Sequence, residues 1–577
     1  MNDLLTQPIV RFHYFPYDLC FWFRNFSNRH ERVARAVQSW HIAEQQGWDA
    51  VVDSVRSYGY DMSAHTLEQV AKPLRKSPRV PSLPFAGSTP FMLRVPSASG
   101  TGHVNGLDQM ADAFKHFRER YGDIYRLDLP GVGAGVQGTL VVITDPREFT
   151  KVLKCEGEFP MGAIQTQWPV RTYAEHGFAH ITQWWDRGAR WKTYRRLMQK
   201  DLLATHRYLP GMRRAAGLAS QSAPEFKDLG LFTARSSFDL FCMAMFGQLS
   251  ETAAAATTAT TTSGNARAQE QRRPDIYLPF CEDVLEIGTH VMPMIKSPYE
   301  TVADRVGMTT ARAQRLHSAL DRANGHAASL IDGFIARARD GTLSEAERQS
   351  YLWHVLQRQQ CQDDVSVTEV AELCQVFMVA AVDTTSALLN WIVLQLAIHP
   401  HIQDTLHQEL KKAPPGTTPA YLHEVIRESH RMRPALPAFM FKSLDRDAEL
   451  LGFHLPAKTV VLLDSHTLQN DPRIAESPDS FCPERWHPDQ VKSRRGTPAE
   501  VLDHRLLRHA FSAGARMCPG WKLASTEVTC MITQLVLDWR FSVPAEQGIT
   551  SIADVPYEHG FAVHPKSMPE FVFESRT

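Results

Sequence analysis

A run of mostly apolar residues from about Ser366 to Ile398 constrains the fold of this chain more than any other feature. Ser366 and Glu369 have the S-x-x-E spacing of a capping box, which marks the start of a helix. A helix that is apolar on nearly all sides has to be buried on nearly all sides. We therefore expect a large domain, mainly α with a smaller β part, in which one long helix crosses the middle.

The rest of the chain divides into an extension, a linker and this large domain. We expect residues 1–72 to form a polar, loosely helical extension, and the closely spaced prolines of residues 73–85 cannot continue a helix or a central strand. We expect residues 86–577 to form the main domain, with a low-complexity Ala/Thr insert at 250–272. Two apolar runs that flank a Gly-rich turn predict a β-hairpin at 123–144.

Charge and cysteine content exclude several classes of function. With 62 Lys and Arg against 63 Asp and Glu, the net charge is -1, which argues against nucleic acid as a partner because phosphate binding normally needs a basic surplus. The nine Cys form no CxxC pair, so we expect neither a disulfide framework nor a structural zinc site.

Membrane contact is expected to be peripheral. We expect no spanning helix, which would need ~18–20 consecutive apolar residues. The mild basic bias of the first forty residues is typical of an organelle transit peptide, and a helix that lies on a membrane surface has the same bias.

Cys518 is the cysteine whose neighbours indicate chemistry. It follows Arg516 by two residues in a loop bounded by Gly514 and Gly520, just before a helical pattern that begins near Leu523. A thiolate near a helix N-terminus is stabilised by exposed N–H groups and the helix dipole, and the glycines let the backbone approach a flat ligand. Such a loop suits a thiolate that is the axial ligand of a haem iron.

The surrounding motif resembles that of the cytochrome P-450 family, the haem-thiolate monooxygenases. Its F-x-x-G-x-R-x-C-x-G pattern is carried by Phe511, Gly514, Arg516, Cys518 and Gly520. The similarity continues upstream in the family's order and covers roughly residues 108–572. It implies the cytochrome P-450 fold, with the long helix passing over the haem. It also implies haem b (iron protoporphyrin IX) as cofactor, with Cys518 as the metal ligand and the other motif residues around it.

Two further motifs resemble the part of the family that holds the Cys loop in place. Glu428 and Arg431 match E-x-x-R, and at i and i+3 on a helix they share one face and can pair. Arg485, in a match to P-E-R-[FW], would join them from a distant loop. A buried network of this kind needs every partner, because removing one costs roughly 3–5 kcal/mol.

The long helix carries a match to the family's oxygen-activation motif between Ala380 and Thr385. The resemblance implies that Thr384 hydrogen-bonds dioxygen and that Asp383 relays protons. Asp and Thr are otherwise costly choices within an apolar helix. Both are therefore candidate catalytic residues.

An upstream helix resembles the one that binds a haem propionate in this family. Trp191 and Arg195 have its W-x-x-x-R spacing, which implies a charge-assisted bond from Arg195 and an indole N–H bond from Trp191. Arg516 is the second propionate candidate. Where the family usually has another Arg after the E-x-x-R helix, this chain has Lys442, so either Lys442 substitutes or that anchor is absent.

The resemblance implies an oxidoreductase of the monooxygenase class (EC 1.14). It would use O2 and NAD(P)H-derived electrons from a redox partner to hydroxylate a large hydrophobic lipid. Segments 156–161, 380–386 and 471–472 look most like the mitochondrial branch. That branch implies a sterol or steroid substrate, a ferredoxin-type donor and a location at the matrix side of the mitochondrial inner membrane.

Several alternatives stay open. The substrate can also be a fatty acid or a xenobiotic, the donor a diflavin reductase, and the compartment the endoplasmic reticulum. A haem-thiolate isomerase or dehydratase needs no reductase, but Asp383 and Thr384 argue against it. A non-catalytic haem- or lipid-binding relative is the other alternative, and the retention of every motif argues against that.

Two surfaces follow from the same resemblance. The substrate pocket would be apolar and aromatic, as a large hydrophobic ligand requires. Its expected residues are Val379, Ala380, Leu436, Phe439, Met440 and Phe561. The face for the electron donor would be basic, and of four expected cations the chain retains Arg427 and Lys522.

Overall fold

The computed structural model describes residues 78–80, 95–96, 103–106, 109–128, 139–160, 169, 172–173, 188–254, 276–305, 307–359, 367–436, 440–507 and 511–576. The extension at 1–72, most of the linker at 73–85, most of the insert at 250–272, and Ser366 and Phe439 therefore lie outside the described residues.

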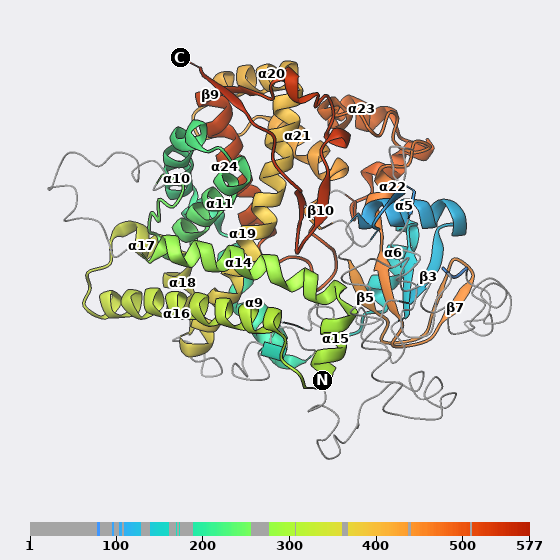
Figure 1. The fold of residues 1–577 in the computed structure, drawn as a ribbon, viewed down its shortest axis with the longest axis horizontal. Helices are drawn as coiled ribbons and strands as arrows, with labels where there is room; N and C mark the ends of the chain where they lie inside the picture. The colour runs from blue at the N-terminus through green and yellow to red at the C-terminus, as the bar shows by residue number, and fades with distance from the viewer. Residues whose placement is uncertain are drawn as a thin grey trace.

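The larger part of the molecule is helical and surrounds α19, Val367–Ile398. Figure 1 shows α19 in the middle of this part, and α11, α14, α16 and α24 all pack against it (Figure 1). The helices of this part are α9 Ala189–Leu202, α10 Leu209–Ser222, α11 Leu229–Phe246, α14 Tyr277–Lys296, α15 Pro298–Arg305, α16 Ala311–Arg339, α17 Glu345–Gln349, α18 Tyr351–Gln359, α20 Pro400–Lys412, α21 Ala420–Met432 and α24 Trp521–Asp538.

The predicted central helix is confirmed. Every residue from 387 to 397 is buried, including the polar Asn390 and Gln395. The expectation that no helix has the length and composition to span a membrane was wrong, because Leu229–Phe246 and Ala380–Ile398 both have them. In each, 78% of the apolar window is buried inside the protein, which identifies core helices.

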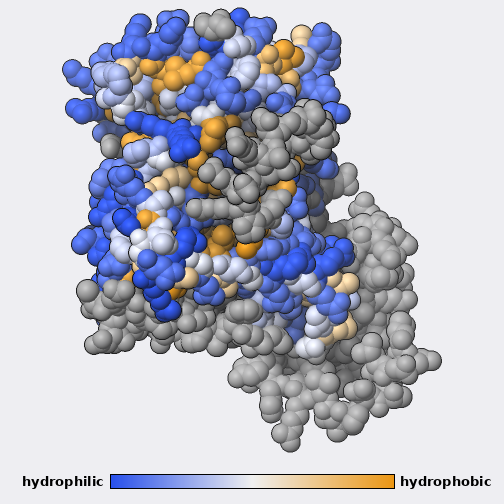
Figure 2. Space-filling model, turned by 90° about the vertical axis from the view of Figure 1, so that its left-hand side faces the viewer, coloured by the Kyte–Doolittle hydropathy of each residue, from blue (hydrophilic) through white to orange (hydrophobic). Residues whose placement is uncertain are grey.

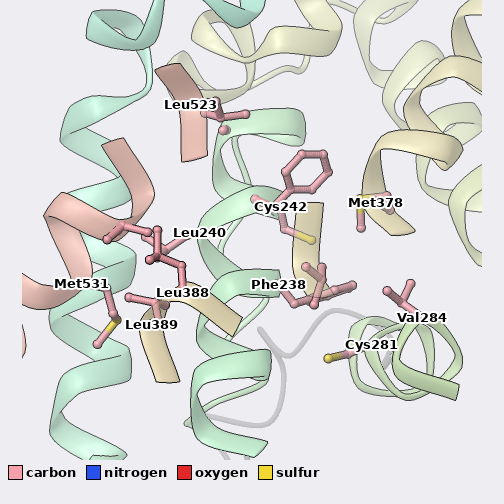
Figure 3. Packing of buried hydrophobic residues seen from close by; sticks show 14 of the residues in the cluster. Phe238, Leu240, Cys242, Cys281, Val284, Met378, Leu388, Leu389, Leu523 and Met531 are labelled. Carbon is pink, nitrogen blue, oxygen red and sulfur yellow. The ribbon is translucent and has the colours of Figure 1, made fainter. Parts of the chain in front are cut away.

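The helices meet in one continuous apolar core. Figure 3 shows Phe238 and Cys242 of α11 facing the side of α14 that carries Cys281 and Val284 (Figure 3). The rings of Phe238 and Phe280 meet edge to face with centroids 5.4 Å apart. This packing fixes α11 and α14 against α19.

A smaller part holds most of the strands and lies to one side of the helices (Figure 1). Its main sheet has the order β3-β4-β8-β5, in which only the β4–β8 pair is parallel. The predicted hairpin is confirmed as the antiparallel pair β3–β4. The four strands are β3 Ile124–Asp128, β4 Thr139–Ile143, β8 Val460–Leu463 and β5 Phe441–Ser443.

Short pairs and helices complete the described fold, and the mixed fold class is confirmed. The remaining antiparallel pairs are β1 Val95–Pro96 with β2 His103–Val104, β6 Ala448–Leu450 with β7 Phe453–Leu455, β9 Trp539–Ser542 with β12 Val572–Ser575, and β10 Tyr557–His559 with β11 Val563–Pro565. The remaining α-helices are α5 Met110–Tyr121, α6 Pro146–Lys154, α22 Ser465–Gln469 and α23 Pro488–Ser493. The 3-10 turns are η3 Thr205–Arg207, η4 Ala223–Glu225, η5 Pro483–Trp486, η6 Pro498–Asp503, η7 Ala545–Gln547 and η8 Ile552–Asp554.

The surface seen in Figure 2 is mainly hydrophilic, with small hydrophobic areas between charged ones (Figure 2). The start of the predicted Ala/Thr insert is not part of a loose loop. Asp239 accepts hydrogen bonds from the Ser250 hydroxyl (2.6 Å), the Thr252 N–H (2.8 Å) and the Ala253 N–H (3.0 Å), and Thr252 and Ala253 are buried. The first residues of the predicted insert are therefore anchored on α11, and the rest of it lies outside the described residues.

Candidate functional site

Cys518 lies in a tight loop that ends at the first turn of α24. The Cys518 N–H donates to Phe511 O (2.9 Å) and the Met517 N–H to Gly514 O (3.1 Å), so the loop folds back on itself. The Cys518 residue is partly exposed. Burial raises the pKa of its thiol, whereas the Gly520 N–H and the charge of Arg195 act in the opposite direction and favour the thiolate.

Gly514 is the residue on which the loop's shape depends. Its φ of +77° is in the left-handed region, and a Cβ there would lie 2.6 Å from Glu156 Oε2 and 2.9 Å from Leu153 Cδ2. Both the conformation and the close approach of α6 therefore require glycine.

Helix α9 brings its basic residues to the same loop. The Arg195 Nη2 donates to Met517 O (2.6 Å), and the guanidinium of Arg516 lies 4.0 Å above the ring of the buried Trp191. The Arg516 Nε donates to Pro160 O (3.0 Å). The structure thus brings Trp191 and Arg195 of α9 beside Arg516 and Cys518, although the two segments lie more than 300 residues apart in the sequence.

The predicted charge network is present and buried. The carboxylate of Glu428 accepts two bonds from Arg431, from Nε (3.0 Å) and Nη2 (2.9 Å), and one from Arg485 Nε (3.2 Å). The indole N–H of Trp486 donates to Glu428 Oε2 (2.8 Å), a contact that the motif did not predict. The side chains of Glu428 and Arg431 have no exposed surface. The helix α21 is thereby tied to the segment that precedes the Cys518 loop.

Asp383 and Thr384 lie near the middle of α19, and both residues are partly exposed. The Thr384 hydroxyl donates back to Ala380 O (2.9 Å), four residues earlier. Both oxygens of Asp383 face the β10–β11 hairpin: Oδ2 accepts from the Ala562 N–H (3.0 Å), and Oδ1 lies 3.0 Å from His564 Nε2.

Lys442 is buried where the sheet meets the Cys518 loop. Its ammonium donates to Ala513 O (2.7 Å) and lies 3.3 Å from Glu156 Oε1. The Lys442 ammonium is therefore already paired with protein groups. This favours the absence of an additional propionate anchor over its replacement by Lys442.

The comparisons with known proteins bear on this arrangement. The model of the cytochrome P450 family matches residues 94–568. The chain belongs to that family. Proteins of the P450 family carry haem b and use O2 with NADPH-derived electrons that reach them through a redox partner.

Individual relatives match a shorter stretch of this P450. It is 31% identical over 39% of its length to trans-cinnamate 4-monooxygenase of Catharanthus roseus, of which 44% is covered. It is 28% identical to carnosic acid synthase of Salvia fruticosa, over 32% of this chain and 37% of the relative. It is 27% identical to cytochrome P450 4c21 of Blattella germanica, over 35% and 41%. The chain thus spans less than half the length of these curated relatives.

The residues around Cys518 fit a haem. A partly exposed thiol at a helix N-terminus is a suitable donor for iron, with a backbone N–H and a guanidinium that favour its anionic form. Two guanidinium groups, those of Arg195 and Arg516, lie beside this loop and could bind two carboxylates.

The predicted substrate contacts of the P450 fall into three groups. Ala380, Leu436 and Phe561 are partly exposed, and the bond from Val563 N to Ala435 O (2.9 Å) brings two of their segments together. Met440 is buried in the apolar cluster of the small sheet, which favours a packing role for it. Phe439 and the side chain of Val379 lie outside the described residues.

Of the two residues predicted for the partner face, Lys522 is exposed and Arg427 is partly buried. The Arg427 guanidinium lies 3.7 Å above the ring of Trp486 and 3.6 Å from Asp503, where it supports the Glu428 network. Stacking on an indole is a structural use that the sequence motif does not reveal.

Sequence reasoning missed two residues that contact the oxygen-activation segment. His564 pairs with Asp383, and Glu527 of α24 accepts from the Thr385 hydroxyl (3.4 Å). Burial raises the pKa of Glu527 to about 8. In the sequence, His564 is a His at an alternating position of a strand, and Glu527 is a lone Glu in an apolar helix. Both patterns are common in protein cores, so neither indicates a functional residue.

Proposed function

We propose that this P450 is a haem-thiolate monooxygenase that hydroxylates a large hydrophobic substrate. The observation that carries the proposal is the Cys518 loop, in which the thiol, Arg195 and Arg516 meet at the N-terminus of α24. Haem supplies activation of O2 by the iron, helped by electron density from its thiolate ligand.

The chain's own residues have distinct parts in this proposal. Cys518 would be the iron ligand, and the Gly520 N–H and Arg195 favour its thiolate form against the effect of burial. Arg195 and Arg516 would hold the propionates. Thr384 and Asp383 would supply protons, with Thr384 giving up its bond to Ala380 O to do so.

A carbon-monoxide difference spectrum of the reduced protein tests the proposal. We expect the wild type and Cys482→Ala to give the Soret band of a thiolate-ligated haem, and Cys518→Ala to lose it. Cys482 is a suitable control because it lies in the segment that packs on Glu428, away from the loop. A wild type that binds haem without this band would overturn the proposal.

We infer a sterol or steroid as the first substrate class to test. The support is the resemblance of three segments to the mitochondrial branch and the apolar character of Ala380, Leu436 and Phe561. Ferric protein is titrated with cholesterol, lauric acid and trans-cinnamate, and displacement of water from the iron is followed in the Soret region. A shift with cholesterol supports the class, and a shift with lauric acid or cinnamate alone overturns it.

The electron donor and the compartment are inferred from the same branch. We infer a ferredoxin-type donor and a mitochondrial location, with Lys522 as one cation of the docking face. Turnover with a ferredoxin system but not with a diflavin reductase supports the donor. Imaging of the tagged protein with and without residues 1–72 tests the location, because mitochondrial signal should require the extension.

A further inference from the structure

Among the described residues, the hydrogen bonds of the Asp383 carboxylate go to one hairpin. Its Oδ2 accepts from the Ala562 N–H and its Oδ1 faces His564 Nε2, both at 3.0 Å. On the other side, Gly288 of α14 comes close enough that a Cβ would lie 3.6 Å from Oδ1. Asp383 therefore has a fixed orientation set by residues about 180 positions later in the chain.

The hairpin itself is fastened to three other segments. The indole N–H of Trp391 on α19 donates to Val563 O (2.8 Å), and Val563 N donates to Ala435 O (2.9 Å). The Lys296 ammonium at the end of α14 donates to His559 O (2.5 Å). These bonds fix where Ala562 and His564 lie relative to Asp383.

The second nitrogen of His564 belongs to a hydrogen-bond chain. His564 Nδ1 lies 3.3 Å from Asn390 Nδ2, and Asn390 Oδ1 lies 2.5 Å from the Thr233 hydroxyl of α11. That hydroxyl is also 2.9 Å from Gly230 O. A hydroxyl has one proton, so it can donate to only one of these two oxygens at a time.

These hydrogen bonds from His564 to Thr233 can form in either protonation state of the imidazole. With neutral His564, Thr233 donates to Asn390 Oδ1, Asn390 Nδ2 donates to Nδ1, and Nε2–H donates to Asp383. With the imidazolium, the amide of Asn390 turns over. Nδ1–H then donates to Asn390 Oδ1, Nδ2 donates to the Thr233 hydroxyl, and Thr233 donates to Gly230 O. In both states His564 Nδ1, Asn390 Oδ1, one Asn390 N–H and the Thr233 hydroxyl are paired, so a change of protonation at His564 avoids the usual penalty of about 1–3 kcal/mol for unpairing them.

We infer that His564 is a positioning residue that orients Asp383 and supplies it with protons, and that Asn390 and Thr233 adapt to its change of charge. The inference rests on the proposed function. In the proton step, the Nε2–H bond of the imidazolium breaks, an O–H bond forms at Asp383 Oδ1, and the imidazole keeps its proton at Nδ1. Since the side chain of His564 is 25% exposed, it regains a proton from water.

The charges around His564 support the imidazolium. Burial lowers the pKa of His564, but Asp383 and, more weakly, Glu558 across the hairpin raise it, and the net shift is upward from 6.5. Thr233 of α11 and Asn390 of α19, which continue the hydrogen-bond series, and Gly288 of α14, which lies near Asp383, are uncharged. The neighbouring His559 is not a competing cation, because burial lowers its pKa to about 3.

Stability as a function of pH gives the first test, which does not depend on activity. Because the pKa of His564 is raised, its pairing with Asp383 stabilises the fold fully below pH 6.5, and the gain is lost as the pH rises through the raised value. In ferric holoprotein we expect the unfolding midpoint of the wild type to fall over this window. For His564→Gln, which keeps an N–H donor but does not titrate, we expect a smaller fall. His454→Gln is the matched control, because it removes an exposed His–Asp pair.

Oxygen consumption gives the second test. With a ferredoxin, its reductase and NADPH as the electron source, we expect His564→Leu to slow O2 consumption about tenfold or more and to raise its solvent deuterium isotope effect, with partial rescue in His564→Gln. Identical pH profiles of unfolding for wild type and His564→Gln would overturn the inference. So would unchanged O2 consumption in His564→Leu. Loss of the thiolate Soret band in the wild type is a separate outcome, which overturns the proposed function instead.

Discussion

Buried carboxylates serve opposite purposes in two parts of this molecule. Glu428 accepts bonds from two arginines and one indole, so its negative charge is fully compensated. Glu527 has the Thr385 hydroxyl as its hydrogen-bond partner for one oxygen, while its other oxygen is buried with no partner among the described residues. The first carboxylate is compensated as an anion, whereas burial favours the protonated form of the second.

Replacing Glu428 by Gln tests the first carboxylate. The change keeps the shape of the side chain but leaves Arg431 buried without its counter-charge, so we expect the free energy of unfolding to fall by about 3–5 kcal/mol. Denaturant titration measures this. Glu409→Gln, which removes an exposed pair with Lys412, should change it by less than about 0.5 kcal/mol. Equal effects of the two substitutions would contradict the assignment of Glu428 to a compensated buried network.

Replacing Glu527 by Gln tests the second carboxylate through pH. Because burial raises the pKa of Glu527 to about 8 from 4.5, the unfolded state loses its proton first, and the folded state is penalised increasingly between these values. We expect the variant to gain stability relative to the wild type as the pH rises from 4.5 to 8, by up to about 5 kcal/mol, and the difference then to level off. A difference in unfolding free energy that stays constant from pH 4.5 to 9 would contradict this.

At the scale of single elements, the Cys518 loop depends on one backbone conformation. Gly514→Ala places a Cβ against Glu156 and Leu153 in a left-handed residue, so we expect a loss of stability of about 2 kcal/mol or more and weaker haem retention. Gly452→Ala is the control, since its φ of +76° is similar but nothing lies within 4 Å of its Cβ. Unfolding of both variants and the haem-to-protein absorbance ratio measure the outcome. Equal losses would show that the contact with α6 contributes nothing.

The elements differ in how far the sequence predicted them. The apolar run of α19, the β3–β4 hairpin and the Glu428–Arg431 pair follow from local periodicity and spacing, and all three are present. Met440 packs in an apolar cluster and Arg427 stacks on Trp486, and the sequence reveals neither contact because whether an apolar or basic side chain faces a ligand, a core or solvent depends on distant segments. His564 could not be predicted, since its pairing with Asp383 depends on how a hairpin docks on α19.

At the scale of the whole molecule, one buried ion pair joins the sheet, α6 and the Cys518 loop. Lys442 of β5 lies between Glu156, just after α6, and Ala513 of the loop. Burial raises the pKa of Glu156 and lowers that of Lys442, so each charge needs the other.

A double-mutant cycle tests this junction. We expect Lys442→Met and Glu156→Gln each to lower the free energy of unfolding by about 3–5 kcal/mol, because each leaves a buried group unpaired. The double variant should lose less than the sum by about 1–3 kcal/mol. Denaturant titration of the four proteins gives the coupling, and strict additivity would show that the pair does not act as a unit.

The bonds between early and late segments also set the order in which the protein can be made. Arg118 binds Asp471, 353 residues later, and Arg516 binds Pro160, 356 residues earlier. At a synthesis rate of about 5–20 residues per second, the first partner of such a bond waits roughly 20–70 s for the second. During that time β4 has β3 on one side but an open edge on the other, where β8 will later pair. A nascent chain of this kind depends on chaperones to cover that edge, and slower growth at low temperature should favour soluble protein.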